Sequence, residues 1–327
     1  TLQAIQASRS INWMPKTCAP KTILILRDRA VPAMTYQTDH YAERWKAIGH
    51  RVTEHVGYSL IPRADITLCC IDLTVVPEEY RTAIENLPGI VLNGAIWDIS
   101  RRRYSQLLVN QGDAYNGPVM VKTNANAGGR PELGNDKEYY KSQANTRSWI
   151  VRKGLNFRNF FIRCLKKGKS TSTGEDWKSR KSLDARRYPI YANKSEVPKG
   201  VWKNEFLIVE RFIQPAEEGL HSVYYYVFFG DKEYFGRLRS PNPIVKFTNA
   251  VEDELVPPIK EARRWRKELD IDFGRFDFLK FEGQYYLTDV NKTEGGGVEN
   301  YQYPVEMNVL ASGLDFYLWS DMRHQNE

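Results

Sequence analysis

Apolar and polar positions alternate between two kinds of pattern in the first hundred residues. Short apolar runs at 22–26, 64–71 and 89–93 are typical of strands that are buried on both faces of a parallel sheet. Between these runs, residues 39–48 and 77–87 have the spacing of amphipathic helices. The order strand, helix, strand, helix, strand predicts a small α/β domain with a parallel sheet.

The rest of the chain has a different pattern that is rich in strands. A strand-like run at 117–122 leads into a loop of small residues, and a helical stretch at 258–269 interrupts later strand-like runs. Strands that follow one another with few helices predict an α+β lobe with antiparallel pairing. The later runs lie at 206–212, 222–229, 233–238, 275–281 and 285–290.

Length and composition limit the class of protein. The chain has 327 residues, enough for two or three domains, and its 42% hydrophobic and 27% charged content excludes a mostly disordered protein. No apolar run is long enough for a membrane helix, and the first residues do not resemble a signal peptide. The four cysteines fit neither a zinc site nor a disulfide framework. We therefore expect a cytoplasmic protein without a membrane segment.

The net charge of +7 is unevenly distributed. Residues 141–187 contain 14 Lys and Arg against 3 Asp and Glu, a balance of +11, so the rest of the chain carries −4. Such a basic segment can bind phosphates, an acidic peptide or nucleic acid, or it can be a solvated insertion without a partner. Because the excess is confined to one segment, an acidic partner is favoured over general nucleic-acid binding.

The residues with the clearest chemistry lie on a predicted hairpin that turns at Glu282-Gly283. Asp289 and Asn291 share one strand face, because side chains two apart point the same way. A two-residue turn would put Asp277 on the opposite face from Asp289, whereas a three-residue loop at 282–284 would place them opposite each other. If the three residues form one site, we expect the three-residue loop. Their oxygen atoms suit Mg²⁺ bridging nucleotide phosphates, although an exposed hairpin with solvated acids is the alternative.

The hairpin resembles the signature of the ATP-grasp superfamily. Residues 274–291 are similar to D-alanine–D-alanine ligases, and the spacing of twelve from Asp277 to Asp289 resembles the glutamate ligases that modify ribosomal protein tails. Residues 207–213 resemble the family's hinge between two ATP-binding lobes. Residues 119–122 are similar to the strand whose lysine holds nucleotide phosphates.

The resemblance implies an ATP-grasp fold of class α/β plus α+β. It has a small parallel α/β domain at 1–105, a small lobe at 106–205 with a basic insertion at 141–187, and a C-terminal lobe at 206–327 that carries the metal-binding hairpin. The lobes would hold ATP together with one or two Mg²⁺ ions, for which Mn²⁺ can substitute.

The resemblance also implies roles for individual residues. Arg101 stands where the family often has a second ATP lysine, and Asp289 stands where glutamate is commoner. The cofactor-binding residues would be Arg101, Lys122, Gly128, Gly129, Glu210, Ile213 and Glu218; the metal ligands Asp277, Asp289 and Asn291; and the catalytic residues Arg239, Arg275 and Asn249.

The implied activity is that of an ATP-dependent carboxylate–amine ligase, which forms an amide bond through an acyl phosphate. Its partners would be a small-molecule or peptide carboxylate and an amine acceptor, with an acidic partner at residues 141–187, and the protein could form a homo-oligomer. Two alternatives remain open. One is a kinase that phosphorylates a hydroxyl on an anionic small molecule, and the other is a non-catalytic nucleotide-binding module.

Overall fold

The fold is that of a computed structural model of the chain. The expected helix at 156–165, the loop at 166–175 and most of the basic segment 141–187 lie outside the residues that it describes. No described helix is long and apolar enough to cross a membrane. The structure describes residues 19–31, 36–133, 177–214, 219–295 and 304–318.

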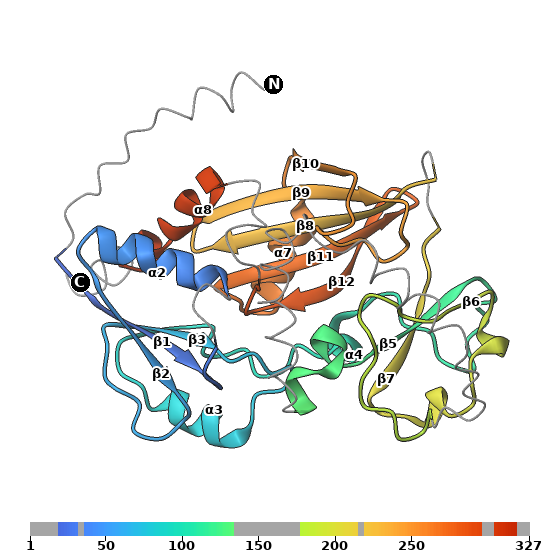
Figure 1. The fold of residues 1–327 in the computed structure, drawn as a ribbon, viewed down its shortest axis with the longest axis horizontal. Coiled ribbons are helices and arrows are strands. Elements are labelled where there is room, and N and C mark those ends of the chain that lie inside the picture. The colour runs from blue at the N-terminus through green and yellow to red at the C-terminus, as the bar shows by residue number, and fades with distance from the viewer. Residues whose placement is uncertain (1–18, 32–35, 134–176, 215–218, 296–303, 319–327) are drawn as a thin grey trace, which may run out of the picture.

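A four-stranded parallel sheet with the strand order β2-β1-β3-β4 forms the N-terminal domain (Figure 1). The central strands β1 and β3 are almost entirely buried, as their continuous apolar runs predict. Helix α2 packs Trp45 on one face of the sheet, and α3 packs Tyr80 on the other. The expected α/β order is therefore confirmed. The elements are β1 (Thr22–Arg27), α2 (Gln37–Ala47), β2 (Arg51–Val56), β3 (Ile66–Cys70), α3 (Glu78–Glu85) and β4 (Ile90–Leu92).

A three-stranded antiparallel sheet with the order β6-β5-β7 forms the small lobe. Val121 of β5 and Val209 of β7 are cross-strand partners in its apolar core. The expected boundary at 205/206 falls just before β7, which pairs with β5 of the preceding lobe. The elements are α4 (Arg101–Tyr104), β5 (Val119–Thr123), β6 (Ile190–Tyr191) and β7 (Leu207–Arg211).

A five-stranded antiparallel sheet with the order β10-β9-β8-β11-β12 forms the C-terminal lobe. Ala262 of α7 packs against the aromatic side chains of one face, while Trp45 of α2 and Leu310 of α8 pack on the other. In Figure 1 this sheet lies above both smaller sheets. The elements are β8 (His221–Phe229), β9 (Lys232–Ser240), β10 (Glu252–Val256), α7 (Lys260–Glu268), β11 (Phe273–Phe281), β12 (Gln284–Asn291) and α8 (Pro304–Ala311).

The expected fold class, α/β plus α+β, is confirmed, but five of the helices and strands given above were not expected from the sequence. These are β2, α4, β6, β10 and α8. The three strands lie at sheet edges, where a strand faces water on one side and needs no continuous apolar run. The sequence RVTEHV of β2, with its mostly exposed positions, shows why the run is missing.

Candidate active site

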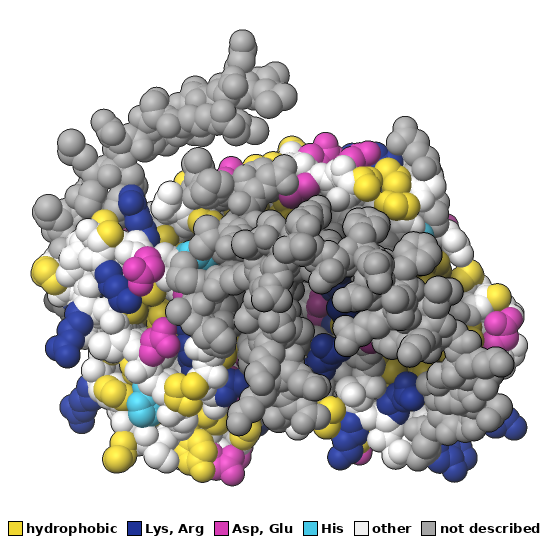
Figure 2. Space-filling model, in the orientation of Figure 1, with side chains coloured by type: hydrophobic (Ala, Val, Ile, Leu, Met, Phe, Trp, Pro, Cys, Tyr) yellow, Lys and Arg dark blue, Asp and Glu magenta, His cyan; other side chains and the backbone are white. Residues whose placement is uncertain are grey.

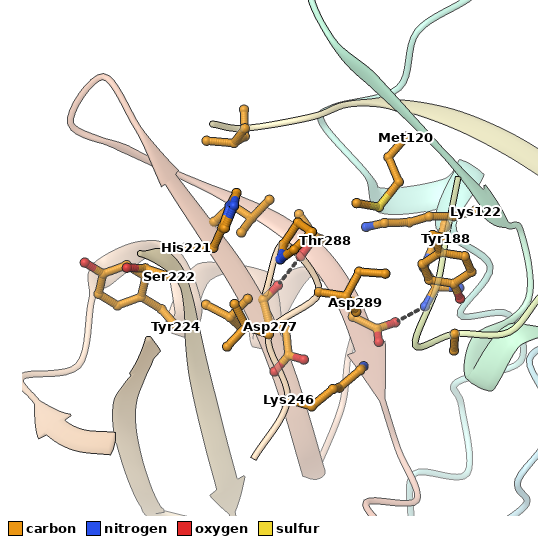
Figure 3. Close-up of a pocket in the computed structure, with 18 of the residues that line it drawn as sticks. Met120, Lys122, Tyr188, His221, Ser222, Tyr224, Lys246, Asp277, Thr288 and Asp289 are labelled. Atoms are coloured by element: carbon orange, nitrogen blue, oxygen red, sulfur yellow. Dashed lines mark hydrogen bonds and ion pairs between the residues drawn. The ribbon is translucent and has the colours of Figure 1, made fainter. Parts of the chain in front are cut away.

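A cavity of about 840 Å³ lies where the three sheets meet. The small lobe contributes Met120 and Lys122, the hairpin contributes Asp277 and Asp289, and the N-terminal domain contributes Asp72. Figure 3 shows the hairpin carboxylates on one side of this space and Lys122 on the other. On the molecular surface, Lys and Arg side chains occur over both the N-terminal domain and the small lobe (Figure 2). The cavity therefore joins acidic and basic groups from all three parts of the chain.

Asp277 and Asp289 lie opposite each other on the hairpin, but the turn is not what brings them there. Glu282 and Gly283 form a two-residue turn with positive φ values of 49° and 79°, so the expected three-residue loop is wrong. A β-bulge at Thr288 shifts the register instead: Phe278 pairs with Leu287, and Asp277 then pairs with Asp289. The bulge, rather than the turn, places both carboxylates on one face.

The hydroxyl of Thr288 stabilises this bulge by donating to the carbonyl oxygen of Asp277 at 3.1 Å. Thr288→Val removes this hydrogen bond and keeps the β-branched shape. We expect it to lower the free energy of unfolding by about 1 kcal/mol and to weaken Mg²⁺-ATP binding. Urea unfolding and calorimetry measure the two effects. Thr288→Ser keeps the hydroxyl and is the matched control; equal losses in both variants would contradict the role of the hydrogen bond.

Each hairpin carboxylate has one oxygen engaged by an arginine. Arg275 donates from Nε to Oδ1 of Asp277 at 2.7 Å, and Arg101 donates from Nη2 to Oδ1 of Asp289 at 2.7 Å. Among the described residues, the Oδ2 atoms of these two carboxylates have no hydrogen-bond partner. The amide oxygen of Asn291 accepts from the backbone N–H of Thr293 at 3.0 Å. Two partly exposed carboxylates and an amide therefore offer oxygen atoms to a cation such as Mg²⁺.

The part of the chain that the structure describes holds no cluster of three or more His, Cys, Asp or Glu of the kind that could bind a metal. The hairpin set has only two carboxylates, with an amide as its third group. Its donors are all oxygen atoms, which are the ligands of hard divalent cations.

Arg101 links three elements at the base of the cavity. Its guanidinium donates to the carbonyl oxygens of Thr123 and Ala125, at 3.1 and 2.5 Å, as well as to Asp289. Burial lowers the pKa of Arg101, but the charge of Asp289, together with smaller effects of Tyr188, Tyr104 and Glu210, outweighs burial and raises the pKa above its ordinary value. Arg101 also lines the cavity.

Lys122 is held by a buried ion pair. Its Nζ lies 2.7 Å from Oε2 of Glu210, and the hydroxyl of Ser105 donates to the other oxygen of Glu210 at 2.6 Å. Glu210 is 1% exposed and does not line the cavity, whereas Ile213 does. The side chain of Glu210 therefore contacts the lysine rather than the space expected for adenine. Glu218, expected at the ribose, lies outside the described residues.

The three residues expected to be catalytic have different positions. Arg275 stacks on the rings of Tyr225 and Phe247, with distances of 5.1 and 4.8 Å to the ring centres. Arg239 forms an ion pair with Glu252 at 2.8 Å, and neither Arg239 nor Arg275 is among the residues that line the cavity.

Asn249 supports the cavity from outside. Its side chain donates to the carbonyl of Ile244 and accepts from the backbone N–H of Lys246, each at 2.9 Å. This holds the turn from which Lys246 points toward the hairpin carboxylates (Figure 3). Arg237 and Lys246 are cavity residues that the sequence motifs did not single out.

The Gly128-Gly129 pair makes a close approach to the chain's own backbone. Both residues have positive φ, 72° and 73°, and a Cβ on Gly128 would lie 2.2 Å from the carbonyl oxygen of Leu183. The backbone N–H of Leu183 donates to the carbonyl of Gly128 at 3.1 Å. The glycines thus admit the segment around Leu183 beside the loop that follows β5, and the neighbouring Ala127 lines the cavity.

Gly128→Ala is therefore expected to destabilise the protein by at least about 2 kcal/mol, from the left-handed backbone and the clash together. The melting temperature measures the effect. The matched control is Gly112→Ala, because a Cβ on Gly112 meets no atom within 4 Å. A Gly128→Ala protein as stable as the control would mean that the segment around Leu183 does not pack there.

Comparisons with known proteins were made by sequence and by structure. No protein-family model matches this chain, and no curated protein matches it. Among solved structures, a RimK domain ATP-grasp protein from Sphaerobacter thermophilus DSM 20745 is 11% identical, over 91% of this chain and 99% of that chain, at a TM-score of 0.45. A D-alanine–D-alanine ligase from Bacillus anthracis is 11% identical, over 94% and 99% of the two chains, at a TM-score of 0.46.

A third similar structure is a RiPP-associated ATP-grasp ligase from Chryseobacterium gregarium, in complex with ADP and a leader and core peptide. It is 8% identical over 89% of this chain and 95% of that chain, at a TM-score of 0.47. At these scores the likeness concerns the course of the chain alone.

Proposed function

We propose that this chain is an ATP-dependent carboxylate–amine ligase that acts through an acyl phosphate and uses Mg²⁺. The observation that carries the proposal is a cavity in which Asp277 and Asp289 lie across from Lys122. In phosphoryl transfer, bound metal ions and cationic side chains together neutralise the charge of the phosphates. The resemblance of residues 274–291 to D-alanine–D-alanine ligases favours amide formation.

The hairpin would hold the metal through the oxygen atoms of Asp277, Asp289 and Asn291. The donor chemistry fits, because Oδ2 of each carboxylate has no hydrogen-bond partner among the described residues. When bound, Mg²⁺ would neutralise the charge that builds on the transferring phosphoryl group. Arg275, which stacks on two aromatic rings and donates to Asp277, would stabilise the same charge.

The small lobe would hold the nucleotide. Lys122 would neutralise phosphate charge, and the Glu210–Ser105 contact keeps its ammonium group in place. Met120 and Ile213 give the cavity an apolar wall of the kind that an adenine ring needs. The adenine would therefore contact Ile213, whereas Glu210 acts through the lysine.

Further basic residues of the cavity fit an anionic carboxylate substrate. Arg130, Arg211 and Lys246 line it, and so does Arg186, which belongs to the described end of the basic segment 141–187. The segment thus reaches the cavity itself. A small-molecule or peptide substrate with an acidic group would be attracted to this wall.

The test is ADP release from Mg²⁺-ATP with a panel of carboxylates, acidic peptides and amines. A ligase releases ADP only when an acid and an amine are both present, and an amide product accompanies the ADP. Release with a hydroxyl compound alone, with a phosphorylated product, would contradict the ligase and establish the kinase. Absence of ATP binding by calorimetry would contradict both.

A further inference from the structure

A group of hydrogen-bond acceptors lies on the N-terminal side of the cavity, beside the hairpin. Asp72 follows β3, at the carboxyl edge of the parallel sheet, where ligands of such sheets commonly bind. Its Oδ2 accepts from the hydroxyl of Tyr36 at 2.8 Å, and its Oδ1 accepts from the hydroxyl of Thr293 at 2.7 Å. All three residues line the cavity.

Asn126, which also lines the cavity, adds a second acceptor. Its backbone N–H donates to the hydroxyl of Thr74 at 2.9 Å, and its Nδ2 donates to the carbonyl of Val290 at 2.6 Å. The acceptor at Val290 fixes the orientation of the amide. The remaining atom, Oδ1, is buried and has no hydrogen-bond partner among the described residues. A buried carbonyl oxygen without a donor is costly, so a ligand that donates a hydrogen bond would be favoured there.

Thr293 joins this acceptor group to the hairpin. Its hydroxyl donates to Asp72, and its backbone N–H donates to Oδ1 of Asn291 at 3.0 Å. Thr293 therefore connects the Asp72 carboxylate to Asn291, one of the proposed metal ligands. The neighbouring Lys292 does not fill the space, because its Nζ lies 3.4 Å from the carbonyl oxygen of Ile96.

The cavity is thus divided by chemistry. Lys122 and the arginines of the small lobe suit phosphate and carboxylate groups, whereas Asp72 and Asn126 present acceptors only. An alkylammonium group carries three donors and a positive charge, which match this second region.

We propose that Asp72 and the Oδ1 atom of Asn126 bind the amine acceptor as its ammonium ion, and that Asp72 is the base that removes its proton. This inference rests on the proposed ligase function and names the part of the cavity that takes its second substrate.

The step balances as follows. The ammonium ion transfers one proton to the Asp72 carboxylate, and the neutral amine attacks the carbonyl carbon of the acyl phosphate. The C–N bond forms, the bond between carbonyl carbon and phosphate oxygen breaks, and phosphate leaves with the electron pair. Phosphate takes the second proton from the new amide nitrogen, and Asp72 releases its proton to solvent.

The surroundings of Asp72 suit a base near neutral pH. Loss of contact with water raises its pKa to about 6, with a further raising effect from Asp28, while the hydroxyls of Thr293 and Tyr36 and the charge of Arg29 lower it. The charges of Lys292 and Asp72 also interact: burial lowers the pKa of Lys292, and the charge of Asp72 offsets part of this effect. Below about pH 6 the carboxyl is protonated and cannot accept the proton, so amide formation should fall on the acid side.

Two small nitrogen nucleophiles test the role of Asp72 directly. Ammonium must lose a proton before it attacks, whereas hydroxylamine is largely unprotonated in mildly alkaline buffer. The assay uses Mg²⁺-ATP and the acid that drives ADP release, and it measures amide from ammonium chloride and hydroxamate from hydroxylamine. For Asp72→Asn, we expect amide formation to fall at least about 100-fold, with hydroxamate formation kept within about threefold of wild type.

The controls separate the possible failures. Asp231→Asn removes an exposed carboxylate at the β8–β9 turn and should keep both reactions. Wild-type amide formation should lose rate below about pH 6, and the Asp72→Asn protein should lack this limb. Equal losses of both products in Asp72→Asn, or no loss of either, would overturn the role of Asp72. A wild-type protein that makes no hydroxamate with any acid would overturn the ligase proposal and this inference with it.

Discussion

Asp289→Asn is expected to lower ADP release at least about 100-fold, because loss of a group that only orients a metal ligand already costs about 10- to 100-fold and Asp289 would hold the metal itself. Asp289 contacts Arg101 at the base of the cavity and pairs with Asp277 on the hairpin. One oxygen accepts from Arg101 at 2.7 Å, and its partner across the hairpin is Asp277. The substitution keeps the size of the side chain but removes the negative charge that would attract Mg²⁺.

The control for this variant is Asp270→Asn. Asp270 lies in an exposed turn after α7 with a φ of 51°, a conformation that asparagine adopts readily. It should release ADP at the wild-type rate. An Asp289→Asn protein that folds and keeps more than a tenth of the wild-type rate would mean that the hairpin is not the metal site.

The second large effect is expected for Lys122→Met. Removing the lysine leaves the carboxylate of Glu210 buried without its counter-charge, since Glu210 is 1% exposed and its other described partner is the Ser105 hydroxyl. Breaking a buried pair from one side costs about 3 kcal/mol. We therefore expect the free energy of unfolding in urea to fall by this amount, and Mg²⁺-ATP binding to be lost.

The double variant Lys122→Met/Glu210→Gln separates these two effects. It removes both charges, so stability should return to within about 1 kcal/mol of wild type, because a buried ion pair contributes little net stability. ATP binding should stay lost, because the lysine charge is still missing. Recovery of ATP binding in the double variant would show that Lys122 serves only to neutralise Glu210.

Continuous apolar runs made much of the fold predictable. The buried strands β1, β3 and β8 are such runs, and their order with the helices predicted a parallel domain followed by antiparallel lobes. Edge strands escaped prediction for the opposite reason. β10 has the sequence EDELV, in which Glu252 and Glu254 are exposed and no continuous apolar run is present.

The register of the hairpin could be predicted only in part from the local sequence. The sequence predicted that Asp277 and Asp289 could share a face only if the pairing gained one residue. The turn residues Glu282 and Gly283 adopt the regular two-residue form, and the extra residue is Thr288, inside the strand. No turn-forming residue marks a bulge at threonine, so the register could not be read from the turn alone.

Contacts between segments that are distant in the chain could not be predicted from the sequence. Arg101 and Asp289 are 188 residues apart, and the side chain of Asp72 meets Thr293 across 221 residues. Only the packing of the N-terminal domain against the hairpin brings these groups together. For the same reason the motifs placed Arg239 in the site, whereas the structure has Arg237 lining the cavity and Arg239 paired with Glu252.

Calorimetric titration of ATP with Mg²⁺ and with EDTA tests the central claim most directly, because it needs no knowledge of the acid or the amine. If Asp277, Asp289 and Asn291 hold a metal against the phosphates, ATP should bind at least about tenfold more tightly with Mg²⁺, a difference of about 1.4 kcal/mol, and Asp289→Asn should abolish the difference. Equal ATP affinity with and without Mg²⁺ in the wild-type protein would contradict the proposed site.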